Sequence, residues 1–222
     1  MTEIVDFPTL AARFVEAQLA GDRREAMRVA LDGIHAGAEI IEIQAHVITE
    51  AQLEIGRLWA LNRISVAQEH LATGISQIVL ARLFELAPTA AKNGKRIAVA
   101  CVEGEHHDLP ARLVADYLTQ AGFEIDFYGA NLPTDALLSA LRDRPPDVLA
   151  LSITMTFHVA ALRDAIARVR AEINAVLPIF VGGHALQWQP SLAAQLGVAT
   201  PGLDGAPHEA VVALAKQLAG VA

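Results

Sequence analysis

The chain has 222 residues, of which 53% are hydrophobic and 19% are charged, a composition typical of a folded protein rather than a disordered one. The formal net charge of −8 excludes a free-standing binder of DNA or of anionic membranes, since either needs a basic face. With a single cysteine (Cys101), acidic residues near the N-terminus and no long apolar run, we expect a cytoplasmic protein without disulfides or membrane spans.

Residues 8 to 88 have the apolar spacing of amphipathic helices. Pro8 suits the start of a first helix that Gly21 ends, and further helices are predicted over 22–36 and 38–61. Ser65 and Gln68 form a predicted capping box, which opens a fourth helix running to Pro88. Four amphipathic helices joined by short turns predict a four-helix bundle as the first domain, residues 1–90.

From residue 91 to 222 the pattern changes to short apolar runs that alternate with helical stretches. The runs cover 97–102, 125–128, 148–153 and 179–181, and the helical stretches cover 110–121, 134–143, 158–174 and 206–220. Runs that are apolar on both faces are typical of parallel strands covered by helices. We therefore expect an α/β fold whose second domain is a doubly wound (flavodoxin- or Rossmann-like) parallel five-stranded sheet.

Three polar motifs each follow the end of one of these runs. Residues 104–110 read Gly-Glu-His-His-Asp-Leu-Pro, Ser152, Thr154 and Thr156 lie at the end of the third run, and Gly182 and Gly183 follow the fourth. A doubly wound sheet binds its ligand beyond the carboxyl ends of its strands. The three motifs are therefore expected to converge on one crevice.

The order and spacing of these motifs resemble the cobalamin-binding signature, in which Asp-x-His-x-x-Gly is followed by Ser-x-Leu and then by Gly-Gly. Forty-one residues separate Pro110 from Ser152. The resemblance implies that His107 ligates cobalt from below, with the adjacent His106 as the competing ligand, and that Glu105 holds the ligand histidine. The chain departs from the signature at Glu105, where Asp is usual, and at Pro110, where Gly is usual.

The same resemblance implies further contacts to cobalamin, namely His106, Asp108, Leu109, Ser152, Thr154, Thr156, Gly182 and Gly183. The three hydroxyls and the glycine pair suit a buried nucleotide tail, because glycine lets a bulky group approach the backbone. Asp108 has an alternative interpretation, since Asp is a good N-cap and a helix is expected to begin at Pro110.

A second motif lies in the helical half, where Trp59 is followed after nine residues by Glu69 and His70. The short turn between the third and fourth helices places all three at one end of the bundle. Helix geometry alone equally allows a core role for Trp59 and a solvated helix start for Glu69 and His70.

Ahead of a cobalamin-binding domain, this motif resembles the light-sensing cobalamin photoreceptor family, in which the bundle covers the upper face of the corrin. The resemblance implies that Trp59 packs near the adenosyl group of adenosylcobalamin and that Glu69 contacts it. It also implies that His70 approaches cobalt once light has broken the cobalt–carbon bond. The implied function is a light sensor that switches by ligand exchange, not an enzyme.

Two alternatives remain open at this point. One is a corrinoid protein that carries methyl groups for a methyltransferase system. In such relatives a hydroxyl six residues after the serine of the second motif serves a proton relay; here His158 stands at that position, so we expect a broken relay, which disfavours methyl transfer. The other alternative is a cobalamin-free interaction module.

The expected partners follow from charge and from the resemblance. Family members often carry a DNA-binding helix-turn-helix, for which there is no room ahead of residue 8, so we expect no direct contact with nucleic acid. We expect a homo-oligomer such as a dimer, with a protein effector or transcription regulator as the recipient of the signal. Some stand-alone relatives also bind a bilin such as biliverdin; Trp188, His158 and His184 are available for one but have no diagnostic spacing.

Overall fold

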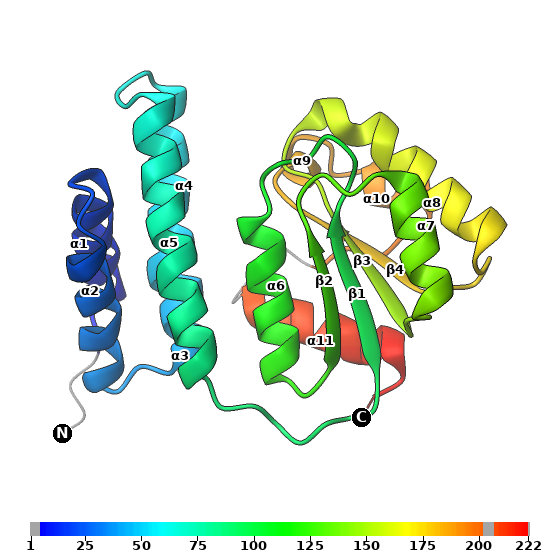
Figure 1. Ribbon diagram of the computed structural model, residues 1–222, viewed down its shortest axis with the longest axis horizontal. Coiled ribbons are helices and arrows are strands. Elements are labelled where there is room, and N and C mark those ends of the chain that lie inside the picture. Colours follow the sequence, from blue (N-terminus) through cyan, green and yellow to red (C-terminus); the bar gives the residue numbers. More distant parts are fainter. Residues whose placement is uncertain (1–4, 202–206, 222) are drawn as a thin grey trace. The chain divides into compact units, whose positions relative to one another are not determined.

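The computed structural model describes residues 5–201 and 207–221 of the chain (Figure 1). It divides into two compact units, one that ends at Pro88 and one that starts at Thr89.

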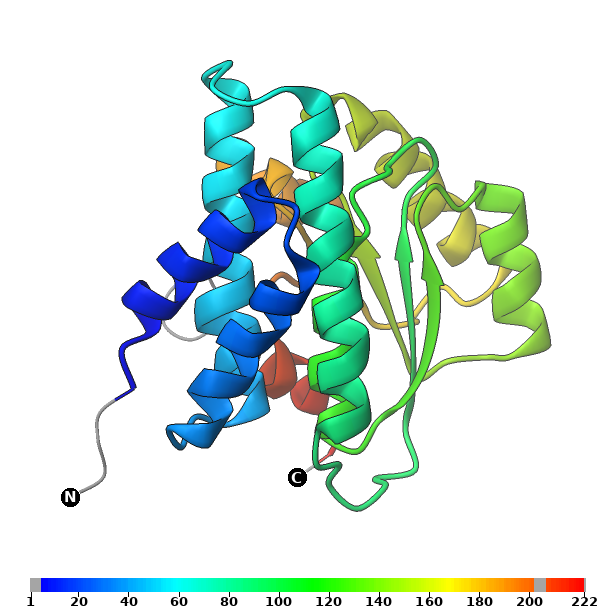
Figure 2. The ribbon, with the colours of Figure 1, turned by 60° about the vertical axis from the view of Figure 1, so that its left-hand side comes forward.

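The first unit is the predicted helical bundle (Figure 2). Its helices are α1 (Phe7–Leu19), α2 (Arg23–His35), a helix composed of α3 (Ile40–Ile43), η1 (Gln44–Ile48) and α4 (Thr49–Ala60), and α5 (Val66–Leu86). The predicted third helix is thus present but contains one π-helical turn, η1. The Thr49 hydroxyl donates to the carbonyl of Gln44 across this turn at 2.9 Å.

Local capping explains where the bundle helices begin. Asp22 accepts hydrogen bonds from the N–H groups of Arg24 and Glu25 at the start of α2. The capping box predicted at Ser65 and Gln68 is confirmed, with the two reciprocal hydrogen bonds at 3.2 and 2.9 Å. The interior of the bundle is filled by fully buried apolar side chains, among them Phe14, Val29, Ile43, Ile48, Ile55, Leu80 and Leu83.

The second unit is built on a parallel sheet. Its strands are β1 (Arg96–Cys101), β2 (Glu124–Gly129), β3 (Val148–Ser152) and β4 (Ile179–Gly182), in the order β2-β1-β3-β4. The prediction of five strands is wrong for the described residues, which form four. Past β4 the chain makes only an isolated bridge, in which Ala199 pairs with Phe180.

Helices cover both faces of this sheet, as the doubly apolar strands predicted (Figure 1). One face packs against α6 (Leu109–Gln120) and α11 (Pro207–Ala219), and the other against α7 (Thr134–Asp143) and α8 (Val159–Glu172). Short helical segments follow β3 and β4, namely η2 (Thr156–His158), α9 (Ala185–Trp188) and α10 (Leu192–Leu196). Residue 206, the expected start of the last helix, lies outside the described residues.

The strand order places the topological switch between β1 and β3. The chain goes from β1 to its neighbour β2 on one side and then crosses to β3 on the other side. In such sheets the loops after the two central strands separate and open a crevice at their carboxyl ends. The first two sequence motifs follow these two strands.

The two edges of the sheet differ in what lies along them. On β2, Glu124 pairs with Arg96 and Arg144 at 2.8 and 3.0 Å, and Asp126 pairs with Arg144 at 2.8 Å. On β4, the bridge to Ala199 occupies the outer side. None of the helices in the described part of the chain is long and apolar enough to cross a bilayer.

Candidate cofactor site

The loop after β1 turns its polar side chains back over the end of the sheet. Gly104 makes this turn possible with φ of +85°, and a Cβ atom there would lie 3.2 Å from the ring of His158. Asn131, in the loop after β2, holds the turn from the other side: its side-chain oxygen accepts the Gly104 N–H at 2.7 Å, and its own N–H donates to the Glu105 carbonyl at 2.7 Å. Glu105 is thereby fixed in a buried position.

The Glu105 carboxylate joins the loops after β1 and β3. Its Oε1 atom accepts the His107 N–H at 2.9 Å and lies 2.5 Å from Nδ1 of the His107 ring. Its Oε2 atom accepts the N–H groups of Thr154 and Met155 at 2.7 and 3.1 Å and lies 3.0 Å from Nδ1 of His158. One carboxylate therefore ties together the two sides of the crevice.

These contacts keep Glu105 ionised. Burial by itself would raise the pKa of this carboxyl, but hydrogen bonds from the His107 ring, from the N–H groups of His107 and Thr154 and from the His158 ring outweigh burial. The net effect is a pKa well below the usual range of glutamate. An ionised Glu105 can only accept, so the His107 proton lies on Nδ1 and the basic lone pair lies on Nε2.

The two neighbouring histidines differ in how the structure holds them. The side chain of His107 is 51% exposed, yet its ring is oriented by Glu105. His106 is also exposed, and its carbonyl accepts the N–H of Asp108 at 3.1 Å. The carboxylate thus orients His107, the residue that the Glu-x-His spacing favoured as the cobalt ligand. The ligand role itself stays a prediction.

The structure corrects the capping interpretation of Asp108. Helix α6 begins at Leu109 rather than at Pro110, and the Asp108 side chain makes no capping hydrogen bond. Pro110 occupies the second helical position. The N–H groups of the first helical turn have no acceptor within the helix, so the missing N–H of proline costs no hydrogen bond there. Leu109 is buried at the helix start, so its predicted contact with cobalamin would be made from a packed position.

The hydroxyl residues after β3 lie in different surroundings. Ser152 is buried in the last position of the strand, and Thr156 is exposed at the start of η2. The Oγ1 atom of Thr154 is buried without a hydrogen-bond partner in the described part of the chain. A buried hydroxyl of this kind gains free energy from a polar group that reaches it.

The glycine pair after β4 divides into two roles. Gly183 has φ of +108°, and a Cβ atom there would lie 2.0 Å from the carbonyl oxygen of Ile153, so this glycine is required by the packing of one loop backbone on another. Around Gly182, by contrast, no atom of the described residues other than its chain neighbours lies within 4 Å of the place a Cβ would take. Gly182 is therefore the position that suits close approach of a ligand.

In the bundle, Trp59, Glu69 and His70 lie at one end, on the last turn of α4 and the first turns of α5. Trp59 is 46% exposed, which contradicts a role as a core aromatic of the bundle. The His70 ring is 74% exposed, and its Nδ1 atom lies 2.5 Å from Glu69 Oε2.

One site residue was missed by sequence reasoning, and the contact of another was not foreseen. Asn131 follows the end of β2, so the strand-end rule that found the other motifs would also have found it. His158 was singled out because it stands where a relay hydroxyl is usual, but its ring is 13% exposed and contacts Glu105 directly. An imidazole thus fills the place expected for a hydroxyl.

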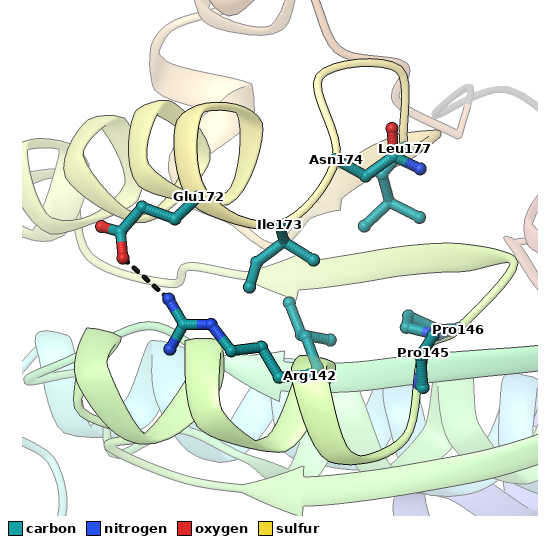
Figure 3. A pocket seen from close by; sticks show the side chains of 8 residues that line it. Arg142, Pro145, Pro146, Glu172, Ile173, Asn174 and Leu177 are labelled. Atoms are coloured by element: carbon teal, nitrogen blue, oxygen red, sulfur yellow. Dashed lines mark hydrogen bonds and ion pairs between the residues drawn. The ribbon is translucent and has the colours of Figure 1, made fainter.

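A separate cavity lies at the opposite end of the sheet, near the amino-terminal ends of β3 and β4 (Figure 3). It has a volume of about 360 Å³ and is lined by Leu141, Arg142, Pro145, Pro146, Glu172, Ile173, Asn174 and Leu177. Arg142 and Glu172 pair at 2.9 Å at its rim. The cavity contains none of the predicted site residues.

The fold and this site define a class: a doubly wound domain that follows a helical bundle and presents a carboxylate-held histidine at its topological switch. Comparison with protein families agrees. Residues 95–213 match the B12 binding domain family, and residues 10–83 match a second family with the same description. The chain therefore belongs to the B12 binding domain family and is a cobalamin-binding protein.

Relatives of two kinds are about equally similar in sequence. The HTH-type transcriptional repressor CarH of Myxococcus xanthus is 28% identical over 169 residues, which cover 76% of this chain and 56% of the repressor. The repressor CarA of the same organism is 32% identical over 126 residues, 54% of this chain and 41% of the repressor. The trimethylamine corrinoid protein of Methanosarcina barkeri is 26% identical over 152 residues, 66% of this chain and 69% of that protein. The chain thus spans about half the length of the two repressors.

Among solved structures, the monomethylamine corrinoid protein of Methanosarcina barkeri has a TM-score of 0.76. The match covers 95% of this chain and 99% of that protein at 18% identity, which shows a shared fold.

The residues present fit a cobalamin. His107 offers an oriented imidazole, a good ligand for a transition metal. Gly182 leaves room at the backbone, and Thr154 offers a buried hydroxyl that lacks a partner among the described residues. These three features lie at the carboxyl ends of β1, β3 and β4, where the fold places a ligand.

Proposed function

We propose that this protein is a light sensor that binds adenosylcobalamin. The observation that carries the proposal is the group Trp59, Glu69 and His70 at one end of the bundle, which comprises an exposed aromatic side chain and an exposed imidazole held by a carboxylate. Apolar packing of the bundle does not require such a group, whereas the upper side of a corrin with an adenosyl ligand would use it. The similarity to CarH over 76% of the chain supports the proposal.

Adenosylcobalamin supplies a cobalt–carbon bond that visible light breaks. On the lower side, His107 provides the ligand atom Nε2 and Glu105 keeps the proton on Nδ1. With the cofactor bound, Trp59 and Glu69 would contact the adenosyl group. His70 would offer cobalt a second imidazole ligand once light has removed that group.

The signal in this proposal is a change in assembly. A homo-oligomer, such as a dimer, forms or dissociates when the bundle residues rearrange, and a protein effector or transcription regulator responds. The related repressors join a cobalamin-binding part to an HTH-type function, which makes a transcription regulator a reasonable recipient.

A second candidate function is a corrinoid methyl carrier, and one observation favours it. His158 contacts Glu105, so a titratable side chain still connects to the carboxylate that holds His107. The hydroxyl of the usual relay is absent, but the side chain at its position reaches the same carboxylate. The methylamine corrinoid proteins among the relatives support the same alternative.

Illumination of the loaded protein separates the two functions. The protein is loaded with adenosylcobalamin in the dark, separated from unbound cofactor, and its absorption spectrum and molar mass are measured before and after green light. A light sensor gives a lasting new spectrum together with a changed molar mass. Because unbound alkylcobalamins are themselves photolabile, bleaching alone does not count as support.

Three other results contradict the proposal. Methyl exchange with a methyltransferase in the dark, without a light-dependent change in mass, would favour the carrier. A colourless protein that loses cobalamin on gel filtration would favour a cobalamin-free interaction module. A spectrum that changes in light, without any change in molar mass or partner binding, would show that the bound cofactor is photolabile but produces no signal. The same spectra test the bilin, since a bound biliverdin adds a red-absorbing band.

A further inference from the structure

A row of polar side chains crosses the bundle from its interior to His70. It starts at Gln18 on α1, passes Gln52 on α4 and continues along α5 through Ser76, Thr73 and Glu69. Residues 69, 73 and 76 share one face of α5 because they are spaced by four and three positions. Gln18 and Ser76 are fully buried, whereas His70 is exposed, so the row runs from the core to the surface.

One backbone carbonyl fixes the direction of the hydrogen bonds. The carbonyl of Ala72 can only accept and lies 2.9 Å from the Gln18 amide, so the NH₂ group of Gln18 faces it. The same NH₂ group donates to Gln52 Oε1 at 2.8 Å, where the Ser76 hydroxyl also donates at 3.2 Å. The NH₂ group of Gln52 must then face Thr73 Oγ1, at 2.8 Å. Exchange of N and O in either amide would bring like groups together.

The row ends on a carboxylate. Thr73 accepts from Gln52, and its single proton is donated to Glu69 Oε1 at 2.8 Å. The other carboxylate oxygen, Oε2, lies 2.5 Å from Nδ1 of His70. The hydrogen bonds from Gln18 to Gln52, Thr73 and Glu69 all run in the same direction, and hydrogen bonds in such a series polarise one another.

We propose that Thr73 and Gln52 are positioning residues that hold the Glu69 carboxylate against Nδ1 of His70 and so determine which ring nitrogen carries the proton. With the proton on Nδ1, the basic lone pair lies on Nε2, the atom able to ligate a metal. The inference rests on the proposed function for the role of His70 at cobalt. The position of the proton can be measured without cofactor.

The test is the tautomer of His70 in the cofactor-free protein. Thr73→Val removes the hydroxyl at nearly constant shape. Nitrogen NMR of ¹⁵N-histidine-labelled protein at about pH 9, above the usual titration range of histidine, reports the ratio of the two neutral tautomers. The His70→Gln variant identifies the His70 signals among the eight histidines.

In Thr73→Val we expect the ratio of the Nδ1–H to the Nε2–H form at His70 to fall about three- to tenfold, because the Glu69 side chain regains rotamers. Thr73→Ser should restore the ratio. Gln52→Met should lower it in the same direction but by less, since the Thr73 hydroxyl remains.

Thr49→Val is the matched control. The Thr49 hydroxyl on α4 donates to the Gln44 carbonyl and is not part of the row, so its loss should change stability without moving the His70 ratio. An unchanged His70 ratio in a folded Thr73→Val protein, or an equal shift in Thr49→Val, overturns the inference. If Thr73→Val does not fold, the outcome for Gln52→Met decides in the same way.

The light experiment keeps this inference separate from the proposed function. A His70 ratio that shifts in Thr73→Val, in a protein whose cobalamin-loaded form shows no lasting light response, supports the positioning role and rejects the light sensor. A wild-type light response with an unmoved ratio rejects the positioning role alone.

Discussion

The Glu105 carboxylate holds the ring of His107 through one oxygen and the loop after β3 through the other. The orientation of the proposed cobalt ligand and the closure of the crevice thus depend on the same side chain. Because Glu105 is buried, the arrangement is rigid. The five hydrogen-bond donors around its carboxylate offset the free-energy cost of burying the negative charge.

Replacement of Glu105 should therefore weaken cofactor binding. In Glu105→Gln the amide cannot accept at both ends, so we expect a loss of about 10- to 100-fold in cobalamin affinity, measured by titration of the apoprotein. Glu103→Gln is the matched control, because Glu103 is exposed and, among the described residues, accepts one long hydrogen bond, at 3.3 Å, from the Thr134 N–H. Equal affinities for both variants would contradict the role of Glu105.

The choice of ligand histidine is tested by a neighbouring pair of variants. His107→Ala should change the spectrum of bound cobalamin from a histidine-ligated form to one without a protein ligand, because the imidazole that Glu105 Oε1 orients is lost. His106→Ala should leave the spectrum unchanged. The reverse pattern would assign the ligand to His106.

The two adjacent glycines should respond differently to a methyl group. Gly183→Ala should destabilise the protein by about 1–3 kcal/mol or more, because of its positive φ and its contact with Ile153. Gly182→Ala should leave the free energy of unfolding unchanged but weaken cobalamin binding. Urea denaturation and cofactor titration measure the two effects. Wild-type affinity in Gly182→Ala would show that the ligand does not approach this backbone.

Trp59 is expected to serve the cofactor rather than the fold. Since its side chain is 46% exposed, Trp59→Ala should change the free energy of unfolding by less than about 1 kcal/mol while it alters the dark stability or the light response of the bound cofactor. Phe14→Ala, at a fully buried position of the same bundle, should cost about 3–5 kcal/mol. Comparable losses in both variants would show that Trp59 is a structural residue.

Cys101 should be inert in the native protein. Burial, together with the nearby Asp108 and Glu105 carboxylates, raises its pKa to about 12, so only about one thiol in ten thousand is ionised at pH 8. A thiol reagent at that pH should label the native protein far more slowly than the urea-unfolded protein. Rapid stoichiometric labelling without urea would contradict this placement of Cys101.

Most helices and strands could be predicted from the sequence, because the patterns that indicate them lie within a few neighbouring residues. Ser65 and Gln68 lie three residues apart, and both hydrogen bonds of their capping box are present. The apolar runs likewise marked all four strands of the described sheet. The predicted fifth strand is not formed by the described residues, in which Ala199 makes only an isolated bridge to Phe180.

The parts of the site that could not be predicted depend on contacts between distant residues. His158 and Glu105 are 53 positions apart in the sequence. Their side chains meet where the chain turns at Gly104, next to the His158 ring. The polar row from Gln18 to Glu69 could not be predicted from the sequence either, because glutamine and threonine on a helix give no periodic signal of their own. The sequence alone does not distinguish Gly182 from Gly183. In the structure, it is Gly183 that has a positive φ and a backbone carbonyl at the place a Cβ atom would take.

The edges of the sheet limit how two copies of this chain can join. Strand addition needs an open edge, but β4 is already bridged at Ala199, and β2 carries Glu124 and Asp126 in pairs with arginines that an incoming strand would have to displace. Copies are therefore expected to meet through side chains on helices and loops. Contacts of that kind come apart without breaking a backbone ladder, which suits the light-dependent change in assembly that we propose.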